Sequence, residues 1–175
     1  MNSDEPEHVA MLRDRLGRFI EDHMPRNKAA KWDAENYFPR DVFDRLADLG
    51  VMGLTVPEEF GGAGRDILAT MIVIEELSRR SLAVSIPYIM SACYAGINLA
   101  EFGSEEQKRE LLPAVAADKL IFAYGWTETD AGADLASVKT TIVRDGGDLV
   151  IDGEKRFCSG AEISYWGGAA LSKTG

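Results

Sequence analysis

Cysteine and histidine are scarce in this sequence of 175 residues, which holds two of each. Cys93 and Cys158 lack the spacing of a metal site, and His8 and His23 both lie in the polar N-terminal region. A disulfide-stapled scaffold is therefore disfavoured, and a histidine-based metal site or a Ser-His-Asp hydrolase has little support. We expect two free thiols, as in a reducing compartment.

Basic residues are also few, with 19 Lys and Arg against 29 Asp and Glu, so the formal net charge is -10. A nucleic-acid-binding protein or a polybasic membrane contact needs a basic face, and both classes are disfavoured. The N-terminus "MNSDEPEHVA" lacks the apolar core of a signal peptide, and no apolar run approaches the length of a membrane span. We expect a cytoplasmic protein without a nucleic-acid partner or a membrane span.

Hydrophobic residues make up 46% of the chain, enough for a sizeable core. Apolar residues recur at helical spacing through most of the first two-thirds. Pro39 at a helix start and Gly50 just past its end follow the asymmetry of helix termini. Asp66 is a predicted N-cap, and Ser104 with Gln107 forms a predicted capping box. The predicted helices cover residues 5–23, 39–49, 67–79, 87–102 and 104–117.

The pattern changes at Leu120. "LIFAYG" is typical of a buried strand, and Asp-Gly steps at 145–146 and 152–153 are hairpin signals. The fold class predicted is α+β: an N-terminal all-α helical bundle over 1–118, then an incomplete antiparallel β domain over 119–175. A β region with only two or three strands needs a partner surface to be stable. Either the chain is truncated, or another chain completes the β region.

The loop after this strand, Tyr124–Asp134, combines small residues, hydroxyls and aromatic rings. Gly125, Gly132 and Ala133 allow close backbone approach to a ligand, Thr127 supplies a hydroxyl, and Tyr124 and Trp126 supply aromatic surface. Backbone amides in such a turn can face a phosphate. The loop suits a flat, phosphorylated cofactor, or it merely turns a corner. It matches neither G-x-x-x-x-G-K-[ST] nor G-x-G-x-x-G.

The segment "AYGWTETDAGADLASVKTT" resembles the flavin-binding signature of the acyl-CoA dehydrogenase family. Four further segments resemble that family in the right order: "LADLGVMGLTVPEEFGGAGRD", "EELSRRS", "FGSEEQKRELLPAVAADKL" and "GDLVIDGEKRFCSGAE". The resemblance covers nearly the whole chain after about residue 30. It implies an N-terminal helical domain, a middle β domain and a C-terminal helical bundle, with FAD between the last two, in dimers or tetramers.

The resemblance also implies roles for individual residues. Tyr124, Trp126 and Thr127 would lie along the isoalloxazine ring, with Thr127 bonding its polar edge. Phe157, Cys158 and Ser159 occupy the family's Trp-Ile-Thr segment, which stacks on the flavin and places a hydroxyl near N5. Gly132 and Ala133 belong to the cofactor loop. Ala133 stands where the family commonly has a serine that contacts the cofactor phosphate or the substrate.

Other residues of these segments are assigned structural or substrate roles. Glu128 is expected to orient the loop, and Asp134 to cap a loop or a helix start. Cys158 is interpreted as a small packing residue, since no basic neighbour in sequence lowers its pKa. The helix over 87–102 is the candidate wall of the acyl site. Its Tyr94 either sets the depth of that site or belongs to the core.

The family reaction is α,β-desaturation of an acyl-CoA, with a carboxylate base and hydride transfer to the flavin. The base usually comes from the C-terminal bundle, so no catalytic residue is assigned in this chain. An electron-transfer flavoprotein is the expected electron acceptor. Two alternatives stay open: a flavin oxidase or monooxygenase of the same superfamily, and a non-catalytic subunit that completes a heteromeric dehydrogenase.

Overall fold

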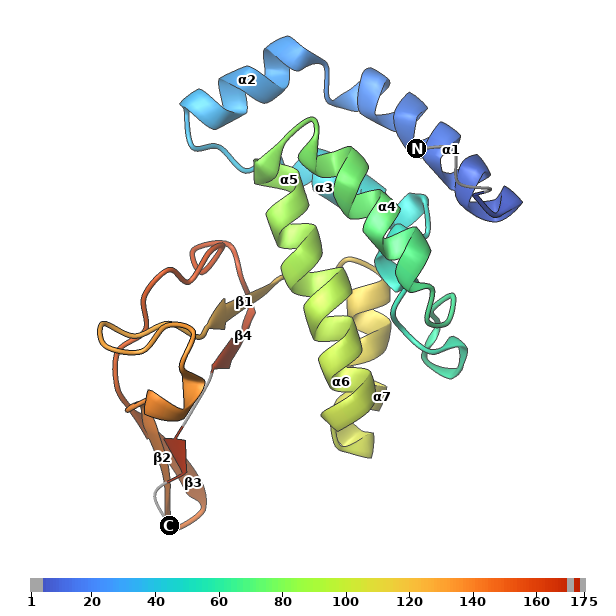
Figure 1. Cartoon of the computed structure of the whole chain (residues 1–175). Helices are drawn as coiled ribbons and strands as arrows, with labels where there is room; N and C mark the ends of the chain where they lie inside the picture. Colours follow the sequence, from blue (N-terminus) through green and yellow to red (C-terminus); the bar gives the residue numbers. More distant parts are fainter. Residues whose placement is uncertain (1–4, 170–171, 174–175) are drawn as a thin grey trace. The chain divides into compact units, whose positions relative to one another are not determined.

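The computed structural model describes residues 5–169 and 172–173, so the outermost residues of both predicted domains (1–4, 170–171 and 174–175) lie outside the described residues. The chain divides into two compact units, Met1–Ile121 and Phe122–Gly175. The division falls close to the boundary predicted between residues 118 and 119. Figure 1 shows that the first unit is helical and that the strands belong to the second.

The first unit is built from α1 (Glu7–His23), α2 (Arg26–Ala34), α3 (Arg40–Asp48), α4 (Ile67–Ser78), α5 (Leu82–Tyr88), η3 (Ile89–Ala95), α6 (Gly96–Phe102) and α7 (Glu105–Ala116). Short 3-10 turns, η1 (Val51–Gly53) and η2 (Glu58–Phe60), join α3 to α4. Helix α1 packs on α4, and α6 packs on α7 (Figure 1). The core collects fully buried side chains from five helices: Leu16, Phe43, Leu46, Leu77, Tyr88 and Leu112. The predicted helical bundle is thus confirmed.

The helix-end signals in the sequence are also confirmed. The side chain of Asp66 accepts a hydrogen bond from the backbone N–H of Ala69 at 2.9 Å and caps α4. Ser104 and Gln107 form the complete capping box at the start of α7. Gly50 has a φ of 75°, the left-handed conformation that favours glycine just past a helix. These local signals hold because their partners lie within four residues.

Helix α2 was not predicted. It begins directly after Pro25, which serves as its N-cap residue, and only Ala29 of its residues is buried. A helix with one small buried side chain has no apolar stripe for a sequence pattern to reveal. Pro25 therefore separates two helices rather than marking the start of a loop.

The predicted start of the helix over 87–102 was wrong. Helix α5 begins at Leu82, continues through the π-helical segment η3 and ends with α6 at Phe102, with Pro87 inside it. By length and composition, the helix Leu82–Phe102 could span a membrane, and it is the one such helix in the described part of the chain. This finding is contrary to expectation. Half of this helix is buried within the protein, as in a core helix, so this is weak support for a membrane span.

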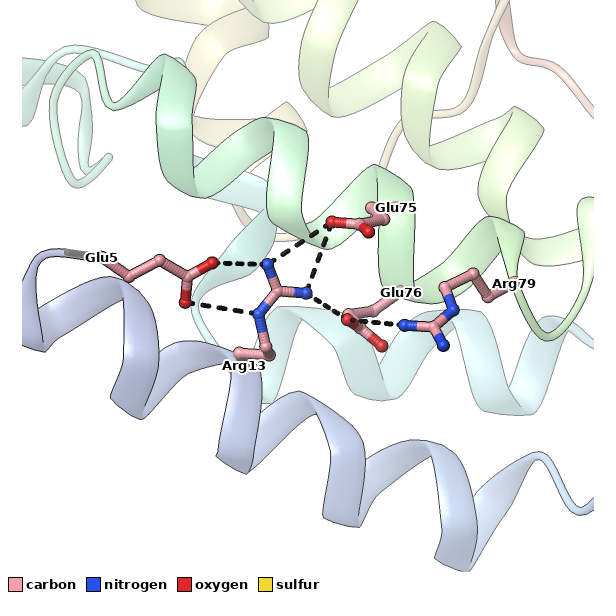
Figure 2. A network of polar contacts seen from close by, with 5 residues as sticks. All are labelled: Glu5, Arg13, Glu75, Glu76 and Arg79. Carbon is pink, nitrogen blue, oxygen red and sulfur yellow. Dashed lines mark hydrogen bonds and ion pairs between the residues drawn. The ribbon is translucent and has the colours of Figure 1, made fainter. Parts of the chain in front are cut away.

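An arginine ties α1 to α4 through a polar network (Figure 2). Arg13 of α1 donates to Glu5 at 2.7 Å and to Glu75 at 3.4 Å, and it also pairs with Glu76, which Arg79 approaches at 3.6 Å. The hydrogen bond from Arg13 lowers the pKa of Glu5, and the same contact raises the pKa of Arg13. Arg13 therefore connects α1 to α4 through ion pairs with Glu75 and Glu76.

The second unit contains β1 (Phe122–Gly125), β2 (Thr141–Asp145), β3 (Asp148–Asp152), β4 (Trp166–Ala169) and β5 (Ser172–Lys173). Strands β2 and β3 form an antiparallel hairpin, which confirms the predicted pairing and the first Asp-Gly turn. Strand β1 pairs with β4, and β2 with β5, in parallel. These parallel pairs join strands far apart in sequence, which hairpin signals cannot reveal.

The second Asp-Gly step is not a hairpin turn, so that prediction was wrong. After β3 the chain runs from Gly153 without a regular element and forms an isolated bridge between Arg156 and Thr127. Gly153 lies against Thr140: a Cβ atom added to it would come within 2.7 Å of the Thr140 Cα. The glycine is required by this close approach of two backbones.

The turn after α7 carries a buried acid. Asp118 has a φ of 55°, is 4% exposed, and neither of its carboxylate oxygens has a hydrogen-bond partner. Burial raises its pKa to about 8; the nearby charge of Arg40 opposes this rise, and that of Asp44 adds to it. Arg40 pairs with Asp44 and donates to the backbone oxygen of Asp118 at 3.0 Å. The Asp118 carboxyl therefore lies protonated at neutral pH.

We predict that Gly153→Ala destabilises the second unit by about 1–3 kcal/mol, because its methyl group overlaps the Thr140 backbone. Urea unfolding of both proteins measures the difference. Gly132→Ala is the matched control, since an added Cβ there meets no atom within 4 Å. Equal stability of Gly153→Ala and the unchanged protein would contradict the close contact.

We predict that Asp118→Asn removes a loss of stability at rising pH. The folded-state pKa is about 8 against an ordinary 3.8, so the native state holds a proton that the unfolded chain releases between these values. Stability thus falls from about pH 4 to pH 8. Asparagine tolerates the left-handed conformation, and its gain at pH 8 is on the order of 2 kcal/mol after the cost of a buried unpaired amide.

Urea unfolding at pH 5 and pH 8 tests this prediction, with the exposed Asp33→Asn as the control. The advantage of Asp118→Asn should be larger at pH 8 than at pH 5. The same advantage at both values would show that the carboxyl does not titrate between them.

Candidate cofactor-binding site

Strand β1 leads into the first predicted cofactor segment. The rings of Tyr124 and Trp126 are stacked, with centroids 6.2 Å apart and planes inclined by 12°. Trp126 is exposed and Tyr124 is half-buried. The two aromatic rings thus lie nearly parallel to one another on the second unit, and the half-buried Thr127 follows them directly in the sequence.

The second predicted segment, Phe157–Ser159, follows β3. Phe157 is 79% exposed and has a φ of 58°, a conformation that bulky residues rarely adopt. The Arg156 guanidinium lies 5.5 Å from the centre of the Phe157 ring, and the Ser159 N–H donates to the Phe157 oxygen at 2.9 Å. Such local strain occurs most often at binding and catalytic sites. The fold therefore holds an aromatic ring out toward solvent at this position.

Direct contacts bring the two segments together. The Arg156 N–H donates to the Thr127 oxygen at 2.8 Å. A Cβ added to Gly125 would lie 3.3 Å from the Cys158 sulfur, so the absent side chain of Gly125 makes room for Cys158. Cys158 is half-buried in this contact, as expected of a packing residue. Aromatic surface from both segments and the hydroxyls of Thr127 and Ser159 thus occur in one part of the second unit.

The loop between the segments is organised by one carboxylate. Glu128 is 8% exposed and accepts hydrogen bonds from the Lys139 N–H at 2.7 Å, the Thr140 N–H at 2.9 Å, the Thr140 hydroxyl and the Lys155 ammonium at 2.8 Å. These hydrogen bonds lower the pKa of Glu128 to about 2. The bond from Lys155 has the largest effect, followed by those from Thr140 and Lys139. Glu128 therefore orients the loop as an ion, which confirms its expected structural role.

The end of the loop, from Gly132 to Asp134, faces solvent, whereas Ala131 is buried. Gly132 and Ala133 are exposed, directly after a turn in which the Glu128 N–H donates to the Ala131 oxygen at 2.8 Å. Asp134 accepts from the Ala136 N–H at 3.1 Å and caps the 3-10 turn η4 (Leu135–Ser137). The expected capping role of Asp134 is thus confirmed, and its carboxylate is engaged within the loop.

Tyr94, the predicted substrate residue, lies in the first unit. It belongs to the π-helical segment η3 and is exposed, whereas the neighbouring Cys93 is buried. It is therefore not a core residue of this unit, and its role at an acyl site stays a prediction. Sequence reasoning missed Lys155 and Thr140 as partners of Glu128. The one signal was Glu128 itself, since a buried carboxylate needs a cation or several donors.

Comparison with protein families assigns both units. Residues 6–119 match the N-terminal domain of acyl-CoA dehydrogenase, and residues 123–173 match the middle domain. The chain belongs to the acyl-CoA dehydrogenase family. The site geometry therefore lies within the middle domain of this family, and Tyr94 lies in the N-terminal domain.

Two curated relatives illustrate the match in sequence. Isobutyryl-CoA dehydrogenase of Dictyostelium discoideum is 36% identical, over 75% of this chain and 32% of the relative. (2S)-methylsuccinyl-CoA dehydrogenase of Cereibacter sphaeroides is 33% identical, over 91% of this chain and 29% of the relative. The chain spans about a third of the length of these relatives.

Solved structures match at the level of the fold and the sequence. A glutaryl-coenzyme A dehydrogenase in complex with glutaryl-CoA has a TM-score of 0.86 and 30% identity, over 94% of this chain and 42% of the other. An acyl-CoA dehydrogenase complexed with FAD from Bacillus anthracis has a TM-score of 0.86 and 25% sequence identity, over 99% of this chain and 30% of the other.

Two further structures bear on the alternatives. The ChsE4-ChsE5 complex from Mycobacterium tuberculosis has a TM-score of 0.82 and 28% identity, over 99% of this chain and 44% of the other. The prolyl acyl carrier protein oxidase AnaB has a TM-score of 0.80 and 27% identity, over 91% and 42%. The proteins of similar sequence or structure thus include dehydrogenases of various substrates, an oxidase and the ChsE4-ChsE5 complex.

We predict that Glu128→Gln lowers the thermal unfolding temperature of the second unit by several degrees at pH 7, because glutamine offers one neutral acceptor oxygen to four donors. The folded-state pKa of about 2 lies below the ordinary 4.5, so the contribution of Glu128 is complete above about pH 4.5 and is lost as pH falls toward 2. Calorimetry at pH 7 and pH 3 should show a smaller difference at pH 3. A difference that does not vary with pH would contradict an ionised Glu128.

Proposed function

We propose that this chain contributes the N-terminal helical domain and the first cofactor-binding segments of an FAD-dependent acyl-CoA dehydrogenase. The observation that carries the proposal is the juxtaposition of the two predicted segments in the middle domain, through Arg156 with Thr127 and Cys158 with Gly125. The aromatic and hydroxyl groups gathered there have the chemistry that a flavin requires. A relative of known structure is complexed with FAD, which supports the same cofactor here.

The residues fit the cofactor by type. Tyr124, Trp126 and Phe157 would contact the face of the isoalloxazine ring, and the hydroxyls of Thr127 and Ser159 would bond its polar edge. Gly132 and Ala133, which are exposed and small, would let the loop approach the pyrophosphate. When bound, FAD supplies an acceptor for the β-hydride of an acyl-CoA. The chain's own contribution would be to present the aromatic and hydroxyl side chains of two connected segments to the ring.

The substrate and the base involve other parts of the protein. Tyr94 is the proposed residue that sets the depth of the acyl site, and Ala133 is separately proposed as a contact of the acyl-CoA substrate. No carboxylate of the described residues is proposed as the base, since Glu128 and Asp134 are engaged in holding the loop. We propose a base outside this chain's 175 residues, in a C-terminal helical bundle. An electron-transfer flavoprotein is the proposed acceptor, and a solved structural relative bears the name of such a protein.

A second candidate is an oxidase of the same superfamily, which the likeness to AnaB favours. It would use the same flavin site, with O₂ as the acceptor. A third is a subunit of a heteromeric dehydrogenase, favoured by the likeness to the ChsE4-ChsE5 complex. Homo-oligomers, dimers or tetramers, are the proposed assembly if no second chain is needed. The three candidates differ in flavin content and in the response to oxygen.

The test uses the protein isolated from its source, whose mass is first compared with the 19.2 kDa of these residues. The flavin-loaded protein is then titrated anaerobically with butyryl-, isobutyryl-, glutaryl- and palmitoyl-CoA. We expect at least one thioester to bleach the visible flavin absorbance. Bleaching that air reverses within one turnover, with O₂ consumed, would favour the oxidase. A protein without flavin, or a flavin that no acyl-CoA bleaches, would contradict the proposed function.

A further inference from the structure

Lys155 contacts three successive parts of the first cofactor segment. Its ammonium donates to the Glu128 carboxylate at 2.8 Å and to the Trp126 backbone oxygen at 3.4 Å. Its Cβ and Cγ lie 3.2 and 3.0 Å from the position of a Cβ on Gly125. The side chain therefore lies along the segment from Gly125 to Glu128, with both its stem and its charge in use.

Lys155 also begins the second cofactor segment. Arg156, the next residue, donates its N–H to the Thr127 oxygen at 2.8 Å, and Phe157–Ser159 follow directly. The Trp126 carbonyl group thus accepts a hydrogen bond from the Lys155 ammonium, and the next carbonyl group, that of Thr127, accepts one from the Arg156 N–H. A displacement of Lys155 would shift both segments relative to one another.

The Lys155–Glu128 pair differs from the other ion pair of this loop in its burial. The side chains of Lys155 and Glu128 are 12% and 8% exposed, whereas those of Lys139 and Asp130, 2.7 Å apart, are 71% and 66% exposed. Breaking a buried pair leaves an uncompensated charge, whereas an exposed pair contributes little. The two lysines therefore make a matched comparison within one loop.

We propose that Lys155 is a positioning residue for the flavin edge, holding the Trp126 and Thr127 backbone in register with Phe157–Ser159. The inference rests on the proposed function, because it assigns the two segments to FAD. Lys155 acts through the segments and is not assigned a contact with the cofactor. The neutral stem packs on Gly125 while the charge fixes Glu128, so neither an apolar nor an arginine side chain reproduces both contacts.

The test compares Lys155→Met and Lys155→Arg with Lys139→Met in the full chain. We expect Lys155→Met to raise the FAD dissociation constant by about tenfold or more, after correction for the folded fraction, because the segments lose their register. Lys139→Met should leave that constant within about twofold, since its ion pair is exposed. Flavin fluorescence measures the affinity, and calorimetry measures the folded fraction.

Amide hydrogen exchange gives a second measure that needs no flavin. The Arg156 N–H should exchange about tenfold faster or more in Lys155→Met and Lys155→Arg, and at the unchanged rate in Lys139→Met. If Lys155→Met does not fold, Lys155→Arg decides, because it keeps the charge. Unchanged Arg156 exchange in Lys155→Arg would overturn the inference.

The two proposals fail in different ways. If the unchanged chain and its complete source protein bind no FAD, the proposed function fails, and Arg156 exchange still tests whether Lys155 sets the register. If FAD binds and Lys155→Met lowers thermal stability without changing the corrected affinity, Lys155 is only structural and the positioning role is overturned. Weakened affinity together with faster Arg156 exchange supports both.

Discussion

The buried carboxylate of Glu128 is the interaction on which the candidate site depends. It joins residues that lie 11, 12 and 27 positions away in sequence, through Lys139, Thr140 and Lys155. A charge with so little exposure is tolerated only when several donors replace its water shell. The hydrogen bonds of this one carboxylate thus connect the loop, the residues just before β2 and the segment after β3.

Among the side chains whose burial is described, hydrophobic burial plays a smaller part in the second unit than in the helical one. The apolar side chains of the β2–β3 hairpin, among them Val143, Leu149 and Ile151, are exposed, whereas Phe43, Tyr88 and Leu112 of the helical unit are buried. An exposed hairpin of this kind gains little from the hydrophobic effect. The register of the two cofactor segments must therefore come from directional polar contacts and from close approach at Gly125 and Gly153.

What could be predicted from the sequence was local. The cap at Asp66, the box at Ser104 and the turn at Gly146 depend on neighbours a few residues away, so composition and spacing reveal them. Helix α2 was not predicted because Ala29 is its one buried residue, so it has no apolar stripe. The parallel pairing of β1 with β4 and of β2 with β5 was not predicted because the paired strands are distant in sequence. The signature loop pointed to a cofactor, but the contact of Arg156 with Thr127 and the left-handed Phe157 required the fold.

Two buried acids, one in each unit, contribute to stability with opposite dependence on pH. In the helical unit, Asp118 is neutral when folded and costs stability as pH rises from about 4 toward 8. In the middle domain, Glu128 is ionised when folded and loses its contribution as pH falls from about 4.5 toward 2. Near pH 5, above the ordinary pKa of both groups, Glu128 makes nearly its full contribution, and Asp118 has removed only part of the stability that it costs at pH 8. At higher pH Glu128 stays ionised while the turn before β1 loses stability through Asp118, so alkaline unfolding should begin at that turn in the helical unit.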